Sequence, residues 1–199
     1  MADTPIVRVS PLATVKSEND VQAGTRASFN GLDLSERRGI AVVQVFARKG
    51  QIAEVNTVLG LTEAGTTPGV ASVTERQTVL PLAPGQWMLT SRLGDDGSFA
   101  SQLRQQLGNH AFVSEQSHGR VVIRVSGANA RPLMQKGCRL DLHPSVAGAG
   151  FCAQTSMAQI GVLIHQLDDQ PTYDLHVYSG FARSFWHWLT TSAAQFGTH

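Results

Sequence analysis

The sequence contains few charged residues. Lys, Arg, Asp and Glu together make up 16% of its 199 residues, whereas an average soluble domain has about 25%. The net charge is only +1 and the basic residues are scattered, so no basic cluster predicts binding to nucleic acid or to an anionic membrane. Because the centres of protein interfaces are poor in Lys, Glu and Asp, a surface with so little charge favours contact with a partner chain.

Long apolar runs are also missing. The sequence has no stretch of about eighteen apolar residues, and its N-terminus lacks the basic and then apolar segments of a secretion signal. We therefore expect a cytoplasmic protein. The length predicts one domain with a good-sized core.

Cysteine is scarce, with only Cys138 and Cys152. We expect both thiols to be reduced and partly or fully buried, and a disulfide between them is the less favoured alternative in the cytoplasm. Each is a candidate nucleophile, but a reactive thiol needs a nearby base or dipole that lowers its pKa. His143 is close to Cys138 in the sequence, yet no further His or Asp is placed to orient it, so a thiol enzyme is the least favoured class.

Residues that bind metals and phosphates occur without the spacing that these ligands need. The seven histidines form no pair at metal-ligand spacing on a helix. His165 and His176 could meet across paired strands, where structural, hydrogen-bonded histidines are commoner. The turn at residues 126–129 lacks the spaced glycines of a dinucleotide loop and the Gly-Lys-Ser/Thr of a P-loop. The sequence thus predicts no catalytic, cofactor-binding or metal-binding residue on this chain.

The sequence does contain many short strand and helix patterns. In its central part they predict a strand at 121–125, a helix at 130–136 with Asn129 as N-cap, and an extended segment at 151–166. Gly137 is predicted to end the helix in a left-handed conformation. Residues 1–37 predict an extended arm with one short strand at residues 6–9. The other predicted elements are strands at 40–46, 70–74, 77–82, 86–92 and 172–178, a helix around 52–59, a helix carrying Phe99, Leu103 and Leu107, and a final helix from Gly180.

The same order of elements occurs twice along the chain. Gly60 and Gly137 close corresponding helices, and Phe99 and Phe181 begin corresponding last helices. This order predicts an α+β fold, with an arm at 1–37 and a single domain at 38–199. The domain would consist of two pseudo-repeats, at about 38–109 and 110–199, each of β-β-α-β-β-β-α type.

The final helix carries a tryptophan outside its apolar stripe. At 3.6 residues per turn, one face holds Phe181, Phe185, Trp188, Leu189, Ser192 and Phe196. Trp186 falls off this face, so its indole either lies along the surface or contacts another chain, where Trp is over-represented. We predict that Trp186 and the arm at residues 2–31 lie against a partner.

Several segments resemble the gamma subunit of heterotetrameric sarcosine oxidase. The most specific are KGCRLDL at 136–142 and CAQT at 152–155, within a similarity that covers 119–155. Further matching segments are SPLA at 10–13, LPLAPGQWML at 80–89 and SGFARSF at 179–185. Together they span nearly the whole chain.

This resemblance implies a fold like the folate-binding domain of the glycine-cleavage T-protein. It also implies a complex that oxidises sarcosine to glycine, with tetrahydrofolate and oxygen giving methylenetetrahydrofolate and hydrogen peroxide. FAD, FMN and NAD would be held by the other subunits, called alpha, beta and delta, and this chain would hold no flavin.

The resemblance also predicts whether this chain is itself catalytic. T-protein-like enzymes carry an acidic catalytic residue on a strand of the first half, where residues 70–92 offer only Glu75 and Arg76 at a turn. The sequence therefore predicts a non-catalytic structural subunit of the oxidase, and the alternative is a free-standing folate-binding or one-carbon-transfer protein.

Overall fold

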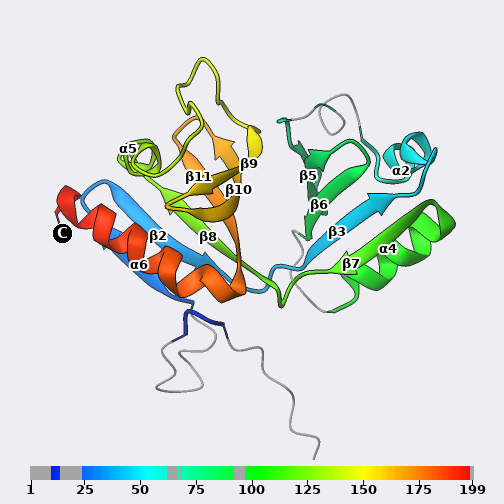
Figure 1. Cartoon of the computed structure of the whole chain (residues 1–199), viewed down its shortest axis with the longest axis horizontal. Helices are drawn as coiled ribbons and strands as arrows, with labels where there is room; N and C mark the ends of the chain where they lie inside the picture. The colour runs from blue at the N-terminus through cyan, green and yellow to red at the C-terminus, as the bar shows by residue number, and fades with distance from the viewer. Residues whose placement is uncertain (1–9, 14–23, 62–66, 68, 92–96, 198–199) are drawn as a thin grey trace, which may run out of the picture.

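The chain folds into two antiparallel β-sheets whose inner faces look toward each other, with the helices on the outer sides (Figure 1). The computed structural model describes residues 10–13, 24–61, 67, 69–91 and 97–197. In the six-stranded sheet the order is β1-β2-β8-β11-β10-β9, and in the five-stranded sheet it is β4-β5-β6-β3-β7. The predicted α+β class is confirmed.

The bounds of the elements are as follows. The six-stranded sheet contains β1 (Arg26–Phe29), β2 (Leu32–Arg37), β8 (Arg120–Ser126), β9 (Cys152–Met157), β10 (Ile160–Asp168) and β11 (Thr172–Tyr178). The five-stranded sheet contains β3 (Val42–Ala47), β4 (Ser72–Val73), β5 (Gln77–Ala83), β6 (Gln86–Ser91) and β7 (Ala111–Glu115). The α-helices are α2 (Ile52–Val58), α4 (Phe99–Leu107), α5 (Ala130–Gln135) and α6 (Ala182–Ala193). Three short 3-10 turns are Gly108–His110, Ser179–Phe181 and Ala194–Phe196.

The chain crosses between the two sheets twice. It begins in the six-stranded sheet with β1 and β2, builds the whole five-stranded sheet from β3 to β7, and then returns with β8. Strand β2 (Leu32–Arg37) pairs with β8 (Arg120–Ser126), which comes after the whole five-stranded sheet in the sequence, and β7 pairs with β3. Consequently β7, which follows the predicted boundary at residues 109 and 110, lies in the same sheet as β3 to β6.

The predicted extended arm is also wrong over its second part. Residues 26–37 form the β1–β2 hairpin, whose strand β2 pairs with β8 from Asp33 to Arg37. Leu12 is buried in the core under the six-stranded sheet, and the Nε of Arg183 on α6 donates a hydrogen bond to the Pro11 carbonyl at 2.7 Å. These parts of the arm therefore pack within the chain itself. The predicted strand at residues 6–9 lies outside the described residues.

The segment predicted as extended over 151–166 is a hairpin of two strands. Ala158 and Gln159 form the turn between β9 and β10, and both adopt left-handed φ angles, of 50° and 66°. These are the positive φ values of a tight hairpin turn, which usually carries Asn or Gly. Neither residue is of that type, so the sequence does not reveal the turn.

Three apolar clusters hold the structure together. The largest lies between the six-stranded sheet and α5 and α6, and a second lies between the five-stranded sheet and α2 and α4. The third cluster joins the two inner faces and contains Val42, Ala71, Leu80, Met88, Val122, Cys152 and Leu163. Because this shared cluster buries side chains of both sheets, we describe the chain as one domain.

Gly127 and Asn129, in the turn between β8 and α5, contact the β1–β2 hairpin and hold it beside β8. A Cβ on Gly127 would lie 2.5 Å from the Gly31 carbonyl oxygen, so the two backbones meet at a glycine. Asn129 occupies the predicted N-cap position of α5, but its side chain donates instead to the Asn30 carbonyl at 2.9 Å. The amide of this residue thus holds the hairpin in place rather than capping the helix.

Gly137 is needed for packing rather than for a left-handed cap. Its φ is not positive, so the prediction of a left-handed conformation is wrong. A Cβ at this position would lie 2.5 Å from a ring carbon of Trp188, an aromatic side chain that stacks on Phe185 with a centroid separation of 5.8 Å. The end of α5 can approach α6 this closely only without a side chain.

We predict that Gly137→Ala destabilises the protein by about 1–3 kcal/mol, the usual cost of overpacking a core. Gly161→Ala is the matched control, because that glycine also has no positive φ and its Cβ would meet no atom within 4 Å. Urea unfolding of both variants measures the effect, and equal stability of the two would contradict the packing role of Gly137.

Candidate functional site

The two cysteines are free thiols, as expected from the sequence. Cys152 is buried and Cys138 is half-buried. Burial raises the pKa of the Cys152 thiol to about 12 and also raises the pKa of Cys138. Both thiols therefore remain protonated near neutral pH, and neither has the thiolate character that nucleophilic catalysis requires.

Cys152 nevertheless lies in a row of polar residues that the sequence did not reveal. On the inner face of the six-stranded sheet Cys152 is the cross-strand partner of His165, His165 that of Asp174, and Asp174 that of Arg124. The residue types are those of a thiol protease triad, but the bonding differs. Within the described chain, no hydrogen bond joins His165 to Cys152 or to Asp174.

The carboxylate of Asp174 is held by Arg124 instead. The guanidinium donates from Nε and Nη2 to the two carboxylate oxygens, at 2.8 and 2.9 Å. This bidentate geometry is the strong form of an arginine–carboxylate pair. No hydrogen bond in the described chain joins Asp174 to His165, so the carboxylate does not orient the imidazole as in a catalytic triad.

His165 and His176 both lie on this inner face, from adjacent strands. His176 faces Leu163 directly, and His165 lies diagonally from it, one row away. Burial lowers the pKa of both imidazoles, for His176 to about 4, although the charge of Asp174 acts in the opposite direction. Both rings are therefore neutral at pH 7. Within the described residues no group of three metal-binding side chains comes together.

These histidines line a cavity of about 530 Å³ between the two sheets, which we call the inter-sheet cavity. Its walls come from β8, β10 and β11 on one side, from β5 and β6 on the other, and from the segment that links β2 to β3. Its charged lining residues are Arg37, Arg38, Arg124 and Asp174. A cavity of this size with convergent polar groups is typical of a small-molecule site.

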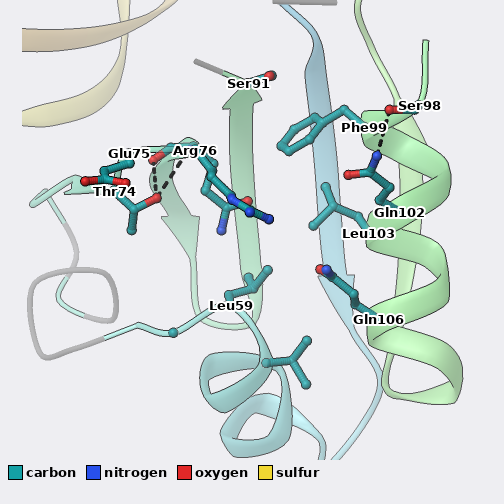
Figure 2. A pocket seen from close by; sticks show the side chains of 13 residues that line it. Leu59, Thr74, Glu75, Arg76, Ser91, Ser98, Phe99, Gln102, Leu103 and Gln106 are labelled. Atoms are coloured by element: carbon teal, nitrogen blue, oxygen red, sulfur yellow. Dashed lines mark hydrogen bonds between the residues drawn. The ribbon is translucent and has the colours of Figure 1, made fainter. Parts of the chain in front are cut away.

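A second cavity, of about 560 Å³, lies within the five-stranded half (Figure 2). Leu59, Phe99 and Leu103 give it an apolar wall, while Glu75 and Arg76 lie on the turn across from α4. Glu75 is exposed on this turn, as the sequence predicted, and is not held by a strand as a catalytic acid would be. Residues 62–66 and 92–96 lie outside the described residues.

Trp186 is half-buried and packs against the apolar core of the six-stranded sheet. Its position is thus less peripheral than the helical periodicity predicted. Phe181, which was assigned to the buried stripe, is 54% exposed because it precedes α6 in a 3-10 turn. Tyr178, at the end of β11, is 50% exposed with the Arg120 guanidinium 3.6 Å from its ring centroid.

We predict that the protein loses stability as the pH falls from about 6.5 toward 4. The pKa of His176 is lower in the folded protein than in the unfolded chain, so the unfolded chain binds more protons in this window and stability rises with pH. The effect of His176 alone is about 2 kcal/mol between pH 7 and pH 4.5.

Urea unfolding at both pH values measures this dependence. His176→Gln should flatten it, whereas His187→Gln, at an exposed position of α6, should leave it unchanged. Asp174, Arg120 and His165 act on His176 in both measurements. Because burial also lowers the pKa of His165, an undiminished pH dependence in His176→Gln would assign the effect to that histidine.

Known proteins resemble this chain along most of its length. A family model described as the sarcosine oxidase gamma subunit family matches residues 39–195. The sarcosine oxidase subunit gamma of Corynebacterium sp. (strain P-1) is 31% identical over 130 residues, which are 65% of this chain and 63% of that protein. The subunit gamma of Corynebacterium sp. (strain U-96) is 27% identical over 201 residues, covering 98% of this chain and 95% of that protein. The chain therefore spans 63% of the length of the first relative and nearly all of the second.

Two solved structures share the fold. A chain of the heterotetrameric sarcosine oxidase from Corynebacterium sp. U-96, in complex with pyrrole 2-carboxylate, superposes with a TM-score of 0.78 at 24% identity, covering 98% of both chains. The glycine cleavage system aminomethyltransferase T from Bartonella henselae gives a TM-score of 0.64 at 13% identity, over 92% of this chain and 57% of that one. The expected likeness to the T-protein fold is confirmed. With a family model that matches residues 39–195 of 199, the chain belongs to the sarcosine oxidase gamma subunit family.

Proposed function

We propose that this chain is the gamma subunit of a heterotetrameric sarcosine oxidase and that it serves there as a structural, non-catalytic component. Support comes from its family, from a relative named subunit gamma that aligns over 98% of the chain, and from a fold shared over its whole length with a chain of such an oxidase. Its partners would be the alpha, beta and delta subunits, in the cytoplasm.

The observation that carries the non-catalytic role is the polar row on the inner face. Asp174 is engaged through both oxygens by Arg124, and burial keeps the Cys152 thiol protonated. The row thus lacks a free carboxylate and a thiolate, and a fold without its reactive groups does not bring a reaction with it. We infer that FAD, FMN and NAD, and the chemistry on sarcosine and tetrahydrofolate, belong to the other subunits.

We also propose that the domain arose from two copies of one α+β unit. The strand orders β4-β5-β6-β3-β7 and β9-β10-β11-β8-β2 correspond position by position, with β1 as an added edge strand. Helices α2 and α5 follow the corresponding strands β3 and β8, and α4 and α6 follow the corresponding strands β6 and β11. The fifth strand differs between the units, because β7 comes after the other strands of its unit in the sequence and β2 comes before them.

We predict that the purified chain alone has no flavin absorbance and forms no peroxide with sarcosine, yet that its removal lowers the yield of the assembled oxidase. A partner that binds only the folded form stabilises it by mass action, so the complex should also melt at a lower temperature without this chain. Visible spectroscopy, a peroxide assay and co-purification with the neighbouring gene products measure these properties.

A flavin spectrum or turnover from the isolated chain would overturn the structural role. The alternative of a free-standing folate-binding protein, which none of the similar proteins supports, makes the opposite prediction. It requires that the isolated chain bind tetrahydrofolate measurably and co-purify with no oxidase subunit.

The proposed partner surface includes Trp186 and the neighbouring exposed ring of Phe181. We predict that Trp186→Ala and Phe181→Ala each reduce the amount of oxidase complex recovered on co-expression, since exposed aromatic residues often anchor interfaces. Because Trp186 also packs on its own core, its variant should lose some stability as an isolated chain, whereas Phe181→Ala should not.

Phe112→Ala is the matched control, because Phe112 is similarly exposed, at 58%, but lies on β7 of the other sheet. Wild-type recovery of both Phe181→Ala and Trp186→Ala complexes would remove this end of α6 from the interface.

A further inference from the structure

The inter-sheet cavity is not explained by a structural role. Packing two sheets together favours continuous apolar contact, as in the shared cluster of Val42, Leu80 and Val122. Next to that cluster the sheets instead leave a partly open cavity of about 530 Å³ lined by charged and polar residues. A concave site of this size with convergent polar groups is a candidate site for a small molecule.

Positive charge predominates around the inter-sheet cavity. Arg37, Arg38 and Arg124 line it, and Asp174 is the only acidic residue among its lining residues. Asp174 is neutralised by Arg124, and the Nε of Arg38 lies 3.6 Å from a carboxylate oxygen of Glu36. Three guanidinium groups are therefore compensated by only two carboxylates, and the remaining positive charge favours binding of an anion.

Three buried polar atoms on residues lining this cavity have no hydrogen-bond partner in the described chain. They are Nη1 of Arg38, Nε2 of His165 and Nδ1 of His176. Folded proteins pair nearly all such atoms with protein, water or ligand. A guanidinium donates, and a neutral imidazole donates from whichever ring nitrogen carries its proton, so these groups can supply donors to the oxygens of a carboxylate, which only accept.

The remaining wall of the cavity is apolar. Ile40, Val122 and Leu167 line it beside the hydroxyls of Thr78 and Thr90. An occupant would therefore place an anionic group near the arginines and an apolar body against these side chains. We propose that the inter-sheet cavity binds a small organic monocarboxylate, with Arg38 as its main charged contact.

Benzoate is a suitable probe because it combines a carboxylate with a compact apolar ring. Titrated calorimetrically into the purified full chain, it should bind with a dissociation constant of about 1 mM or lower. Benzamide has the same shape without the charge and should bind about tenfold more weakly or not at all. Using this chain alone keeps sites on other subunits out of the measurement, and the result does not depend on whether the chain assembles into an oxidase.

Two variants test the position of the site. Arg38→Gln should weaken benzoate binding about tenfold, and Arg37→Gln, at an exposed position where folding is not at risk, should weaken it less. Arg48→Gln is the matched control, because Arg48 lies over the Phe112 ring at 4.2 Å and does not line the cavity.

Equal binding of benzoate and benzamide would overturn the proposal, as would binding that neither Arg38→Gln nor Arg37→Gln reduces. Absence of benzoate binding at about 20 mM, well above the expected dissociation constant, would show that the cavity holds water only.

Discussion

An ion pair between Arg124 and Asp174 compensates the charges that β8 and β11 place on the inner face of the six-stranded sheet. The two side chains are only 27% and 13% exposed. Removing one partner from a buried pair typically costs about 3–5 kcal/mol, because the other charge is left without compensation. The partial exposure of Arg124 reduces that cost here. The pair still affects how the neighbouring His165 is held. With Asp174 engaged, His165 has no carboxylate to orient it, and burial keeps both histidines neutral.

The two crossings of the chain are hydrogen-bonded to the sheets that they connect. Near one of them, the Val42 N–H donates to the hydroxyl of Ser117 at 2.8 Å, and the Gln116 N–H donates to the Val42 carbonyl at 2.7 Å. At the other end of the sheets, Ala71 donates to Gly150, and Cys152 donates to Gly69. The backbone thus bridges the two sheets at the end where β4 and β9 lie, while at the other end the chain itself links β2 to β3 and β7 to β8.

The sequence predicted the local elements well and the long-range pairing poorly. The strands around Val121 and Thr172 and the helix at Phe99 follow from apolar periodicity, which depends only on neighbouring residues. The hairpin of β1 and β2 was missed because its polar residues, such as Asp33 and Ser35, become strand residues only by pairing with β8. The turn at Ala158 was missed because neither turn residue is of a type that favours positive φ.

In the candidate site, too, local features could be predicted from the sequence and long-range neighbours could not. Its residue types are visible in the sequence, which also allowed His165 and His176 to meet across paired strands. Their neighbours depend on register, since a shift of one residue would turn His165 and Asp174 to the opposite face. The row from Cys152 to Arg124 occupies directly paired positions on four strands, although its members are spread over residues 124–174 of the chain. No local pattern contains that information.

The interior cavity and the proposed partner surface lie on opposite sides of the six-stranded sheet. His176 faces the cavity, whereas Trp186 packs on the outer side, against the core beneath α6. Strand β11 is the direct connection between them, because it carries His176, ends at the exposed Tyr178 and continues through the turn of Phe181 into α6. A ligand in the cavity can affect assembly only if such an element has two conformations and the ligand binds one of them more tightly than the other. Since β11 is held on both sides, by β8 and β10 along its length, it offers little freedom for a second state, and the geometry favours binding and assembly that are independent of each other.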